Sequence, residues 1–300
     1  MKILIGVLHC IEKEFDTCIE SIEKQRCSQW NYFVIRDLPK ADAHNALYGR
    51  FMEASNEYDL FLKLDADMVI QSPDFLQRIS DHFTSNPDLE ELQIPVYDHF
   101  TQRDVFGQIT YRNNVTWDCS ERNKLFTDYG AQSKRKEKNI VDFRGDVHHC
   151  SDPSDFQSWH FGLHKATKFT QLDFPAKSYN YWAGLTHWDN IMHIFATAHG
   201  PKQGNMHAAA LAGMMAALKS ELRARHIDYS NIESKKLFES YTANPDNWKP
   251  SPLLAYLLNL SAEQKHRSFG LALIYLAFTA RFLDLRLMKN GFKIALKNTL

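Results

Sequence analysis

The sequence has no excess of charge of either sign and no closely spaced pair of cysteines. Its formal net charge is −1, so no overall electrostatic field favours nucleic acid as a partner. The five cysteines are scattered, and none belongs to a C-x-x-C pair. This pattern argues against a disulfide framework and indicates free thiols in a reducing compartment, so the expected location is cytoplasmic.

Secretion signals, internal repeats and low-complexity tracts are also missing. The opening apolar run, Ile3–Leu8, is too short for the core of a signal peptide, and acidic residues follow it. Hydrophobic residues make up 44% and charged residues 24% of the 300 residues, which is typical of a globular chain that buries a large core. This length suits one large domain, or one domain with an appended part.

Apolar runs alternate with amphipathic segments in the first third of the chain. Strand-like runs lie at 3–8, 32–35 and 60–70, and apolar stripes at helical spacing lie at 15–22, 41–55 and 72–83. Further strands are expected at 92–97, 106–111 and 140–143. The alternation predicts βαβ units and therefore an α/β fold, with a mostly parallel sheet flanked by helices.

The second half of the chain is mainly helical in pattern. An amphipathic segment at 182–198 is followed by a turn-rich break, and the Ala- and Met-rich segment 206–225 favours a helix strongly. We therefore expect one domain over residues 1–200 and a helical C-terminal region over residues 201–300.

Two carboxylates, Asp65 and Asp67, follow the apolar run 60–64. Alternate side chains of a strand share a face, so both are expected to point the same way. Like charges this close are unstable unless a cation lies between them or one carboxyl is protonated. A hard divalent cation, Mg²⁺ or Mn²⁺, suits carboxylate oxygens and usually binds substrate phosphates as well. The alternative is a solvated pair of aspartates in a loop.

Polar side chains also follow the first two expected strands. His9 comes directly after the first strand, and Asp37 follows the second. Ligands of mostly parallel sheets bind at the carboxyl ends of the strands. Three strand ends thus present polar groups at one edge, which favours a metal–diphosphate site over the solvated pair.

The order of these motifs resembles the nucleotide-sugar half of the GT-A glycosyltransferases of the family 2 type, whose sheet is Rossmann-like. Ser21–Gln25 matches the family's Ser-[Ile/Leu]-x-x-Gln helix end, and Asp37 matches an aspartate that reads the nucleotide base. Leu64–Asp67 matches the Asp-x-Asp strand end, and Ala43–Leu47 is similar to an Ala-Leu-Asn-like helix start. The resemblance covers about the first hundred residues.

Two segments depart from the family pattern. His9-Cys10-Ile11 replaces the usual Pro-Tyr-Asn, and Arg36–Pro39 is a reduced form of Asp-Asp-Gly-Ser. The resemblance implies Mn²⁺ or Mg²⁺ as cofactor, with Asp67 as a direct ligand. Asp65 is either a second ligand or a contact to the ribose or to a metal-bound water. The residues implied in binding the nucleotide donor are His9, Asp37, Asn45 and Asp65.

A stretch rich in histidine and aspartate lies at 145–165. Some GT-A enzymes add a late histidine to their Asp-x-Asp motif, which makes His149 the preferred further ligand and His148 the second choice. The alternative is a pair of imidazoles with no metal. An aspartate at a comparable helix start is the general base of inverting members. Asp155 fits that role and Asp152 is the alternative, although capping the helix is the commonest role for such a residue.

The sequence therefore predicts a metal-dependent glycosyltransferase that uses a nucleotide-diphosphate sugar and a saccharide or lipid-linked acceptor. One alternative is a phosphatase of the haloacid dehalogenase type, because Asp65–Val69 also fits Asp-x-Asp-x-[Thr/Val]. That enzyme would place the motif after its first strand and would need a later Gly-Asp-x-x-x-Asp, whose second aspartate is missing after Gly145-Asp146. The other alternative is a non-catalytic nucleotide or sugar binder.

The C-terminal part suggests a contact with a membrane surface. Leu271–Ala280 carries no charge but is too short for a bilayer, which needs about 20 apolar residues. Basic and apolar residues are interleaved after it, as in helices that lie on an anionic membrane. A peripheral position at the inner face of the membrane is thus expected, and a core helix with a solvated tail is the alternative.

Overall fold

The computed structural model describes residues 1–27, 29–121, 127, 130–139, 141–170, 186–187, 189–191, 193–195, 205–219 and 228–249. The chain divides into two compact units, Met1–Ser154 and Asp155–Leu300. The expected domain boundary at residue 200 lies inside the second unit, and it stays a prediction. Among the residues that the structure describes, no helix is both long and apolar enough to span a bilayer.

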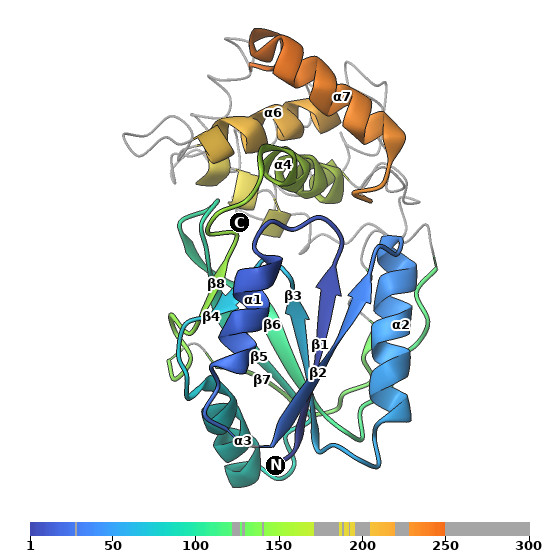
Figure 1. Cartoon of the computed structure of the whole chain (residues 1–300), viewed down its shortest axis with the longest axis vertical. Coiled ribbons are helices and arrows are strands. Elements are labelled where there is room, and N and C mark those ends of the chain that lie inside the picture. The colour runs from blue at the N-terminus through green and yellow to red at the C-terminus, as the bar shows by residue number, and fades with distance from the viewer. Residues whose placement is uncertain are drawn as a thin grey trace, which may run out of the picture. The chain divides into compact units, whose positions relative to one another are not determined.

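The first unit has an α/β fold, as the alternation of patterns predicts (Figure 1). Its helices are α1 (Phe15–Glu23), α2 (Lys40–Glu53) and α3 (Phe75–Ser85). Its strands are β1 (Ile3–His9), β2 (Trp30–Arg36), β3 (Leu60–Asp65), β4 (Met68–Ile70), β5 (Glu91–Asp98), β6 (Arg103–Arg112), β7 (Lys136–Lys138) and β8 (Val147–His149).

These strands form one mixed sheet in the order β2-β1-β3-β6-β5-β8-β4, with β7 beside β5. The pairs β1–β2, β1–β3, β5–β7 and β5–β8 are parallel, whereas β3–β6, β5–β6 and β4–β8 are antiparallel. Parallel pairs thus outnumber antiparallel ones among the described strands. The long strand β6 runs against both of its neighbours, a reversal that the sequence pattern does not reveal.

Helices cover both faces of this sheet because the side chains of its strands alternate. Ile3, Ile5 and Val7 of β1 point into a core shared with α1 and α3, while Leu4 points into a second core under α2. At Gly6 an added Cβ would lie 2.7 Å from Cδ1 of Leu47. The absence of a side chain there lets α2 pack closely on β1.

The strand expected at 140–143 is wrong. Residues 141–143 lie in bends and turns, and the preceding strand is β7, within a basic run that has no apolar pattern. Side-chain contacts explain this exception: Lys136 forms a 3.0 Å ion pair with the buried Glu91, and the Lys138 ammonium lies 4.9 Å from the ring centre of Phe106. Phe143 is still buried, in the core with Phe75.

The second unit is helical where the structure describes it. It contains α4 (Asp155–Thr170), α6 (Asn205–Lys219), α7 (Ile232–Ala243) and the 3-10 turn η4 (Pro245–Trp248). Helix α6 confirms the first part of the helix expected at 206–225. The apolar and basic segments proposed for a membrane surface, after residue 250, lie outside the described residues.

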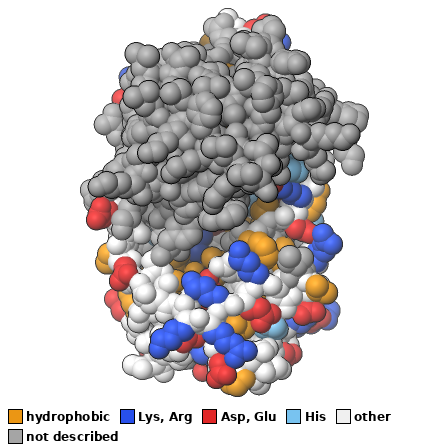
Figure 2. Space-filling view, turned by 180° about the vertical axis from the view of Figure 1, so that it is seen from behind, with side chains coloured by type: hydrophobic (Ala, Val, Ile, Leu, Met, Phe, Trp, Pro, Cys, Tyr) orange, Lys and Arg blue, Asp and Glu red, His pale blue; other side chains and the backbone are white. Residues whose placement is uncertain are grey.

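Both signs of charge are spread over the first unit. Figure 2 shows basic and acidic side chains interspersed on the part of one face where side chains are described. This mixture agrees with the net charge of −1, and it gives that face no field of a single sign.

Candidate active site

Several strands of the first unit end at the same edge of the sheet. Strands β1, β2 and β3 run in one direction (Figure 1), and β5 and β8 run in that direction too, because the antiparallel β6 lies between β3 and β5. The polar residues at or just after these ends are His9, Asp37, Asp65, Asp98 and His149. The sequence predicted polar residues at the ends of three strands at this edge, and the structure places such residues at the ends of five.

Asp67 reaches this edge because of the short link between β3 and β4. Only Ala66 and Asp67 separate the two strands, yet β6, β5 and β8 stand between them in the order of the sheet. The sheet must therefore curl back on itself. Gly107 of β6 lies inside the curl, where an added Cβ would be 2.8 Å from Val96 and 3.5 Å from Met68.

Pairing of β4 with β8 then brings a distant segment to Asp67. Met68 lies opposite His149 in the antiparallel register, and the backbone N–H of Cys150 donates to the carbonyl oxygen of Asp67 over 2.9 Å. Cys150 has a φ of +55°, a left-handed conformation that side-chain-bearing residues rarely adopt. Such strain at a strand end is common at functional sites.

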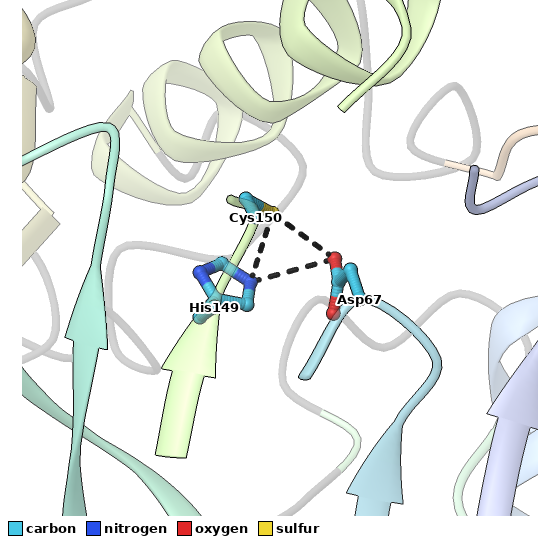
Figure 3. A group of neighbouring side chains, drawn as sticks. All are labelled: Asp67, His149 and Cys150. Atoms are coloured by element: carbon cyan, nitrogen blue, oxygen red, sulfur yellow. Dashed lines mark hydrogen bonds and ion pairs between the residues drawn. The ribbon is translucent and has the colours of Figure 1, made fainter. Parts of the chain in front are cut away.

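Three different metal-binding groups meet here, on Asp67, His149 and Cys150 (Figure 3). Nε2 of His149 lies 3.4 Å from Oδ2 of Asp67. Sγ of Cys150 lies 3.2 Å from the same carboxylate oxygen and 3.3 Å from Nε2 of His149. The ligand atoms all lie within 4.8 Å of one another, so one small ion is within reach of all three.

His149 lies between two carboxylates. Its Nδ1 is 2.7 Å from Oδ1 of the buried Asp98, and its Nε2 faces Asp67. Burial alone would lower the pKa of His149, but the neighbouring thiol and carboxylate groups raise it well above 6.5. Burial would likewise raise the pKa of Asp67, yet the His149 charge and hydrogen bonds lower it to about 2. The two side chains therefore stabilise each other as an ion pair.

One oxygen of Asp67 is left without a partner. Its Oδ1 is buried and accepts no hydrogen bond from the residues that the structure describes. A buried carboxylate oxygen without a donor is costly, since burial removes the water that would otherwise bind it. A cation held by this carboxylate would remove the cost, so the residues present fit a divalent ion.

Asp65 does not join this group. Its carboxylate forms a 2.8 Å ion pair with the buried Lys63, two residues earlier on the same face of β3. Asp67 lies in the turn after the strand, so the argument that both carboxylates share a strand face is wrong for Asp67. A metal or ribose contact of Asp65 stays a prediction.

The other expected donor contacts lie at or beyond the ends of β1 and β2. Nδ1 of His9 accepts from Nη1 of Arg36 over 2.9 Å, and burial together with this guanidinium lowers the pKa of His9. Asp37 is exposed, with a left-handed φ of +57°. Both ends of the Asn45 amide bind the backbone of Ser120, which is a structural role. Nucleotide binding by these residues stays a prediction.

The two candidate bases lie in different units. Asp152, in the first unit, is exposed and forms a 2.7 Å ion pair with Lys13. Asp155 is the first residue of α4 in the second unit, and it too is exposed. Burial and the Asp155 charge raise the pKa of Tyr241 within that unit. A catalytic role for either aspartate stays a prediction.

His148 points away from this group. Its Nδ1 is 3.4 Å from Nε2 of His99, and its ring lies 5.4 Å from that of Tyr97. Adjacent strand residues face opposite ways, so His149 and not His148 lies beside Asp67. Metal binding by either histidine stays a prediction.

Sequence reasoning missed three residues of the site: Glu12, Asp98 and Cys150. Burial and the nearby Asp67 carboxylate raise the pKa of Glu12 to about 7, and its carboxylate accepts from the backbone N–H groups of Cys10 and Ile11. A group of this pKa is suited to exchanging protons near neutral pH. A signal did exist, because Glu12 follows β1, Asp98 ends β5 and Cys150 adjoins His149.

No protein-family model matches the sequence, and a search of curated proteins finds no relative. Among solved structures, the chain resembles A197 from STIV with a TM-score of 0.31 and 17% identity, over 37% of this chain and 65%, slightly less than two thirds, of the other. It also resembles CMP:2-keto-3-deoxy-manno-octonic acid synthetase complexed with CTP, with a TM-score of 0.29 and 12% identity, over 47% and 91% of the two chains. At these TM-scores neither likeness supports a functional argument.

Proposed function

We propose that the chain is a metal-dependent glycosyltransferase, which moves a sugar from a nucleotide-diphosphate donor to a saccharide or lipid-linked acceptor. The observation that carries the proposal is Asp67 itself. It is a largely buried carboxylate at the carboxyl edge of the sheet, it lies beside His149, and one of its oxygens has no hydrogen-bond partner in the described part of the chain. The resemblance of the Asp-x-Asp segment and its preceding motifs to GT-A enzymes supports the same function.

In this proposal the residues at the carboxyl edge of the sheet have different roles. Asp67 and His149 hold the divalent ion, Mn²⁺ or Mg²⁺. A bound cation at this point supplies electrophilic stabilisation for the charge that develops on the diphosphate leaving group. Asp37, exposed at the end of β2, contacts the base or ribose of the donor, with His9, Asn45 and Asp65 as further donor contacts. Asp155, or Asp152 in its place, accepts the proton of the acceptor hydroxyl if the reaction inverts.

The position of the motif argues against the phosphatase alternative. A haloacid dehalogenase needs its Asp-x-Asp after the first strand, whereas here the motif follows β3, and two βα units precede it.

The test is release of nucleoside diphosphate from a set of nucleotide-sugar donors, with and without Mn²⁺ or Mg²⁺. We expect metal-stimulated turnover in the native chain and its loss in Asp67→Asn, with the fold intact by circular dichroism. Asp81→Asn is the matched control, because Asp81 is exposed on α3, away from the sheet edge. Near-normal, metal-stimulated activity of Asp67→Asn would overturn the proposal.

Thermal-shift measurements separate the remaining alternatives. Nucleoside diphosphates that stabilise the chain only with metal, but are released from no donor, would indicate a non-catalytic binder. Hydrolysis of simple phosphomonoesters would indicate a phosphatase.

A further inference from the structure

The donor set of the site includes a thiol as well as a carboxylate and an imidazole. The three contacts between Asp67, His149 and Cys150 measure 3.2, 3.3 and 3.4 Å. Zn²⁺ binds oxygen and nitrogen at about 2.0–2.2 Å and sulfur at about 2.3 Å, so tetrahedral ligands stand roughly 3.4–3.6 Å apart. The three ligand atoms therefore need to move apart by only a few tenths of an ångström to surround such an ion.

The imidazole is already oriented by a carboxylate behind it. Asp98 accepts from Nδ1 of His149 and is itself fixed by the backbone N–H of Thr101 at 2.9 Å and by the Thr101 hydroxyl. In the neutral ring this bond keeps the proton on Nδ1 and leaves the lone pair of Nε2 directed toward Asp67. A carboxylate behind a histidine in this way is the common second-shell arrangement of protein zinc sites.

Cys150 is held in place by the backbone. Its N–H bonds to the carbonyl oxygen of Asp67, its φ is +55°, and its side chain is buried. This conformation directs Sγ toward the Asp67 carboxylate and His149 (Figure 3). The pairing of β4 with β8 thus places both the His149 imidazole and the Cys150 thiol beside Asp67.

We propose that Cys150 is the third protein ligand of the ion, with Asp67 and His149, and that the site binds Zn²⁺ in preference to Mn²⁺ and Mg²⁺. On binding, the Cys150 thiol and Nε2 of the His149 imidazolium each release a proton to solvent, and the thiolate sulfur and the freed Nε2 lone pair coordinate the ion. Thiolate is a soft ligand that favours zinc and is a poor ligand for magnesium, which prefers oxygen. Three protein ligands leave a fourth position open, as in catalytic zinc sites.

This inference names Zn²⁺, in place of Mn²⁺ or Mg²⁺, as the preferred ion of the same site, and it rests on the proposed function only for the ion's effect on the donor diphosphate. Binding of the ion is measured without any donor. A failure of the transferase assay would leave the metal preference standing, and a failure of metal binding would be seen whatever reaction the chain catalyses.

The test is metal binding to the full, chelator-treated chain by calorimetry, with Zn²⁺, Mn²⁺ and Mg²⁺ alone. We expect affinity in the order Zn²⁺, Mn²⁺, Mg²⁺, and a loss of about tenfold or more for Zn²⁺ in Cys150→Ser, but little change for Mg²⁺. Cobalt substitution gives a second readout, since a Co²⁺–thiolate bond produces a charge-transfer absorption. We expect that absorption in the native chain and its loss in Cys150→Ser.

The matched control is Cys18→Ala, because Cys18 is also buried and its thiol is near the backbone of Asp65 but outside the group. This variant should keep the cobalt absorption. The absorption surviving in Cys150→Ser would overturn the proposal. So would a native chain that binds Zn²⁺ no more tightly than Mg²⁺, a result that needs no variant and so does not depend on how the serine substitution folds.

Discussion

The ion pair between Asp67 and His149 makes a prediction about stability that requires no substrate. Asp67 is 13% exposed in its side chain, and its pKa of about 2 lies below the ordinary value of 3.8. At roughly 1.4 kcal/mol per pKa unit, ionised Asp67 stabilises the metal-free fold by about 2 kcal/mol. Asparagine has nearly the same shape as the protonated carboxyl, so Asp67→Asn removes this contribution with little change in packing.

The sign of the pH dependence follows from the direction of the shift. Because the pKa is lower in the folded state, the stabilisation is fully present above about pH 4 and is lost as the pH falls toward 2. The difference in free energy of unfolding between native chain and Asp67→Asn should therefore be about 2 kcal/mol at pH 7. It should shrink to about 1 kcal/mol at pH 3, where Asp67 is mostly protonated in the unfolded chain but still mostly ionised in the folded one.

The assay is urea unfolding of chelator-treated protein at pH 7, 5 and 3, with equal m-values as the condition for comparing midpoints. Asp81→Asn should match the native chain throughout, because Asp81 is exposed. A destabilisation of the same size at pH 7 and pH 3 would mean that packing, and not charge, is responsible. No destabilisation at pH 7 would refute the ion pair as a stabilising contact. Adding Zn²⁺ should then stabilise the native chain and not the variant.

Two further predictions concern the donor and the C-terminal part. Asp37→Ala should weaken the binding of uridine diphosphate by about 1–3 kcal/mol, the usual cost of leaving a polar partner unsatisfied, whereas unchanged affinity in calorimetry would exclude this contact. The full chain should co-sediment with anionic vesicles, and a chain truncated after Leu260 should not, because the truncation removes the basic and apolar tail. Equal binding by both chains, or binding by neither, would rule out the membrane role.

The fold of the first unit was largely predictable because its signals are local. Continuous apolar runs mark β1 and β3, and apolar stripes mark α1 and α3. The position of β6 between β3 and β5 was not predictable, because nothing in the run 103–112 encodes its neighbours. Strand β7 was not predicted for a different reason. Its residues are charged, and its pairing with β5 is supported by contacts of Lys136 with Glu91 and of Lys138 with Phe106.

The site was predictable only in part, for a related reason. The pattern identified Asp67 and His149 from their chemistry, but the geometry that joins them depends on contacts between residues far apart in the chain. Asp98 is 51 residues from His149, and Cys150 is 83 residues from Asp67. The ion pair of Asp65 with Lys63, in contrast, is local. The two residues are two positions apart in one strand, so the alternation of side chains alone would have predicted that they share a face.

The register of β8 decides which of the two histidines lies beside Asp67. Tyr97 and Asp98 of β5 lie beside His148 and His149, and Val69 and Met68 of β4 lie opposite the same two residues. Paired residues project to the same face of a sheet, so His149 shares its face with Asp98, while His148 shares its face with Tyr97. The hydrogen bond from His149 to Asp98 and the ring contact of His148 with Tyr97 both follow.

A shift of one residue in this short strand would exchange the two histidines, because it moves every side chain of the strand to the opposite face. It would also remove Cys150 from Asp67, whose carbonyl now accepts the Cys150 N–H. The hydrogen bond from His149 to the buried Asp98 and the hydrogen bond from the Cys150 N–H to Asp67 both depend on the register observed. Holding that register brings together the aspartate, histidine and cysteine of the candidate metal site.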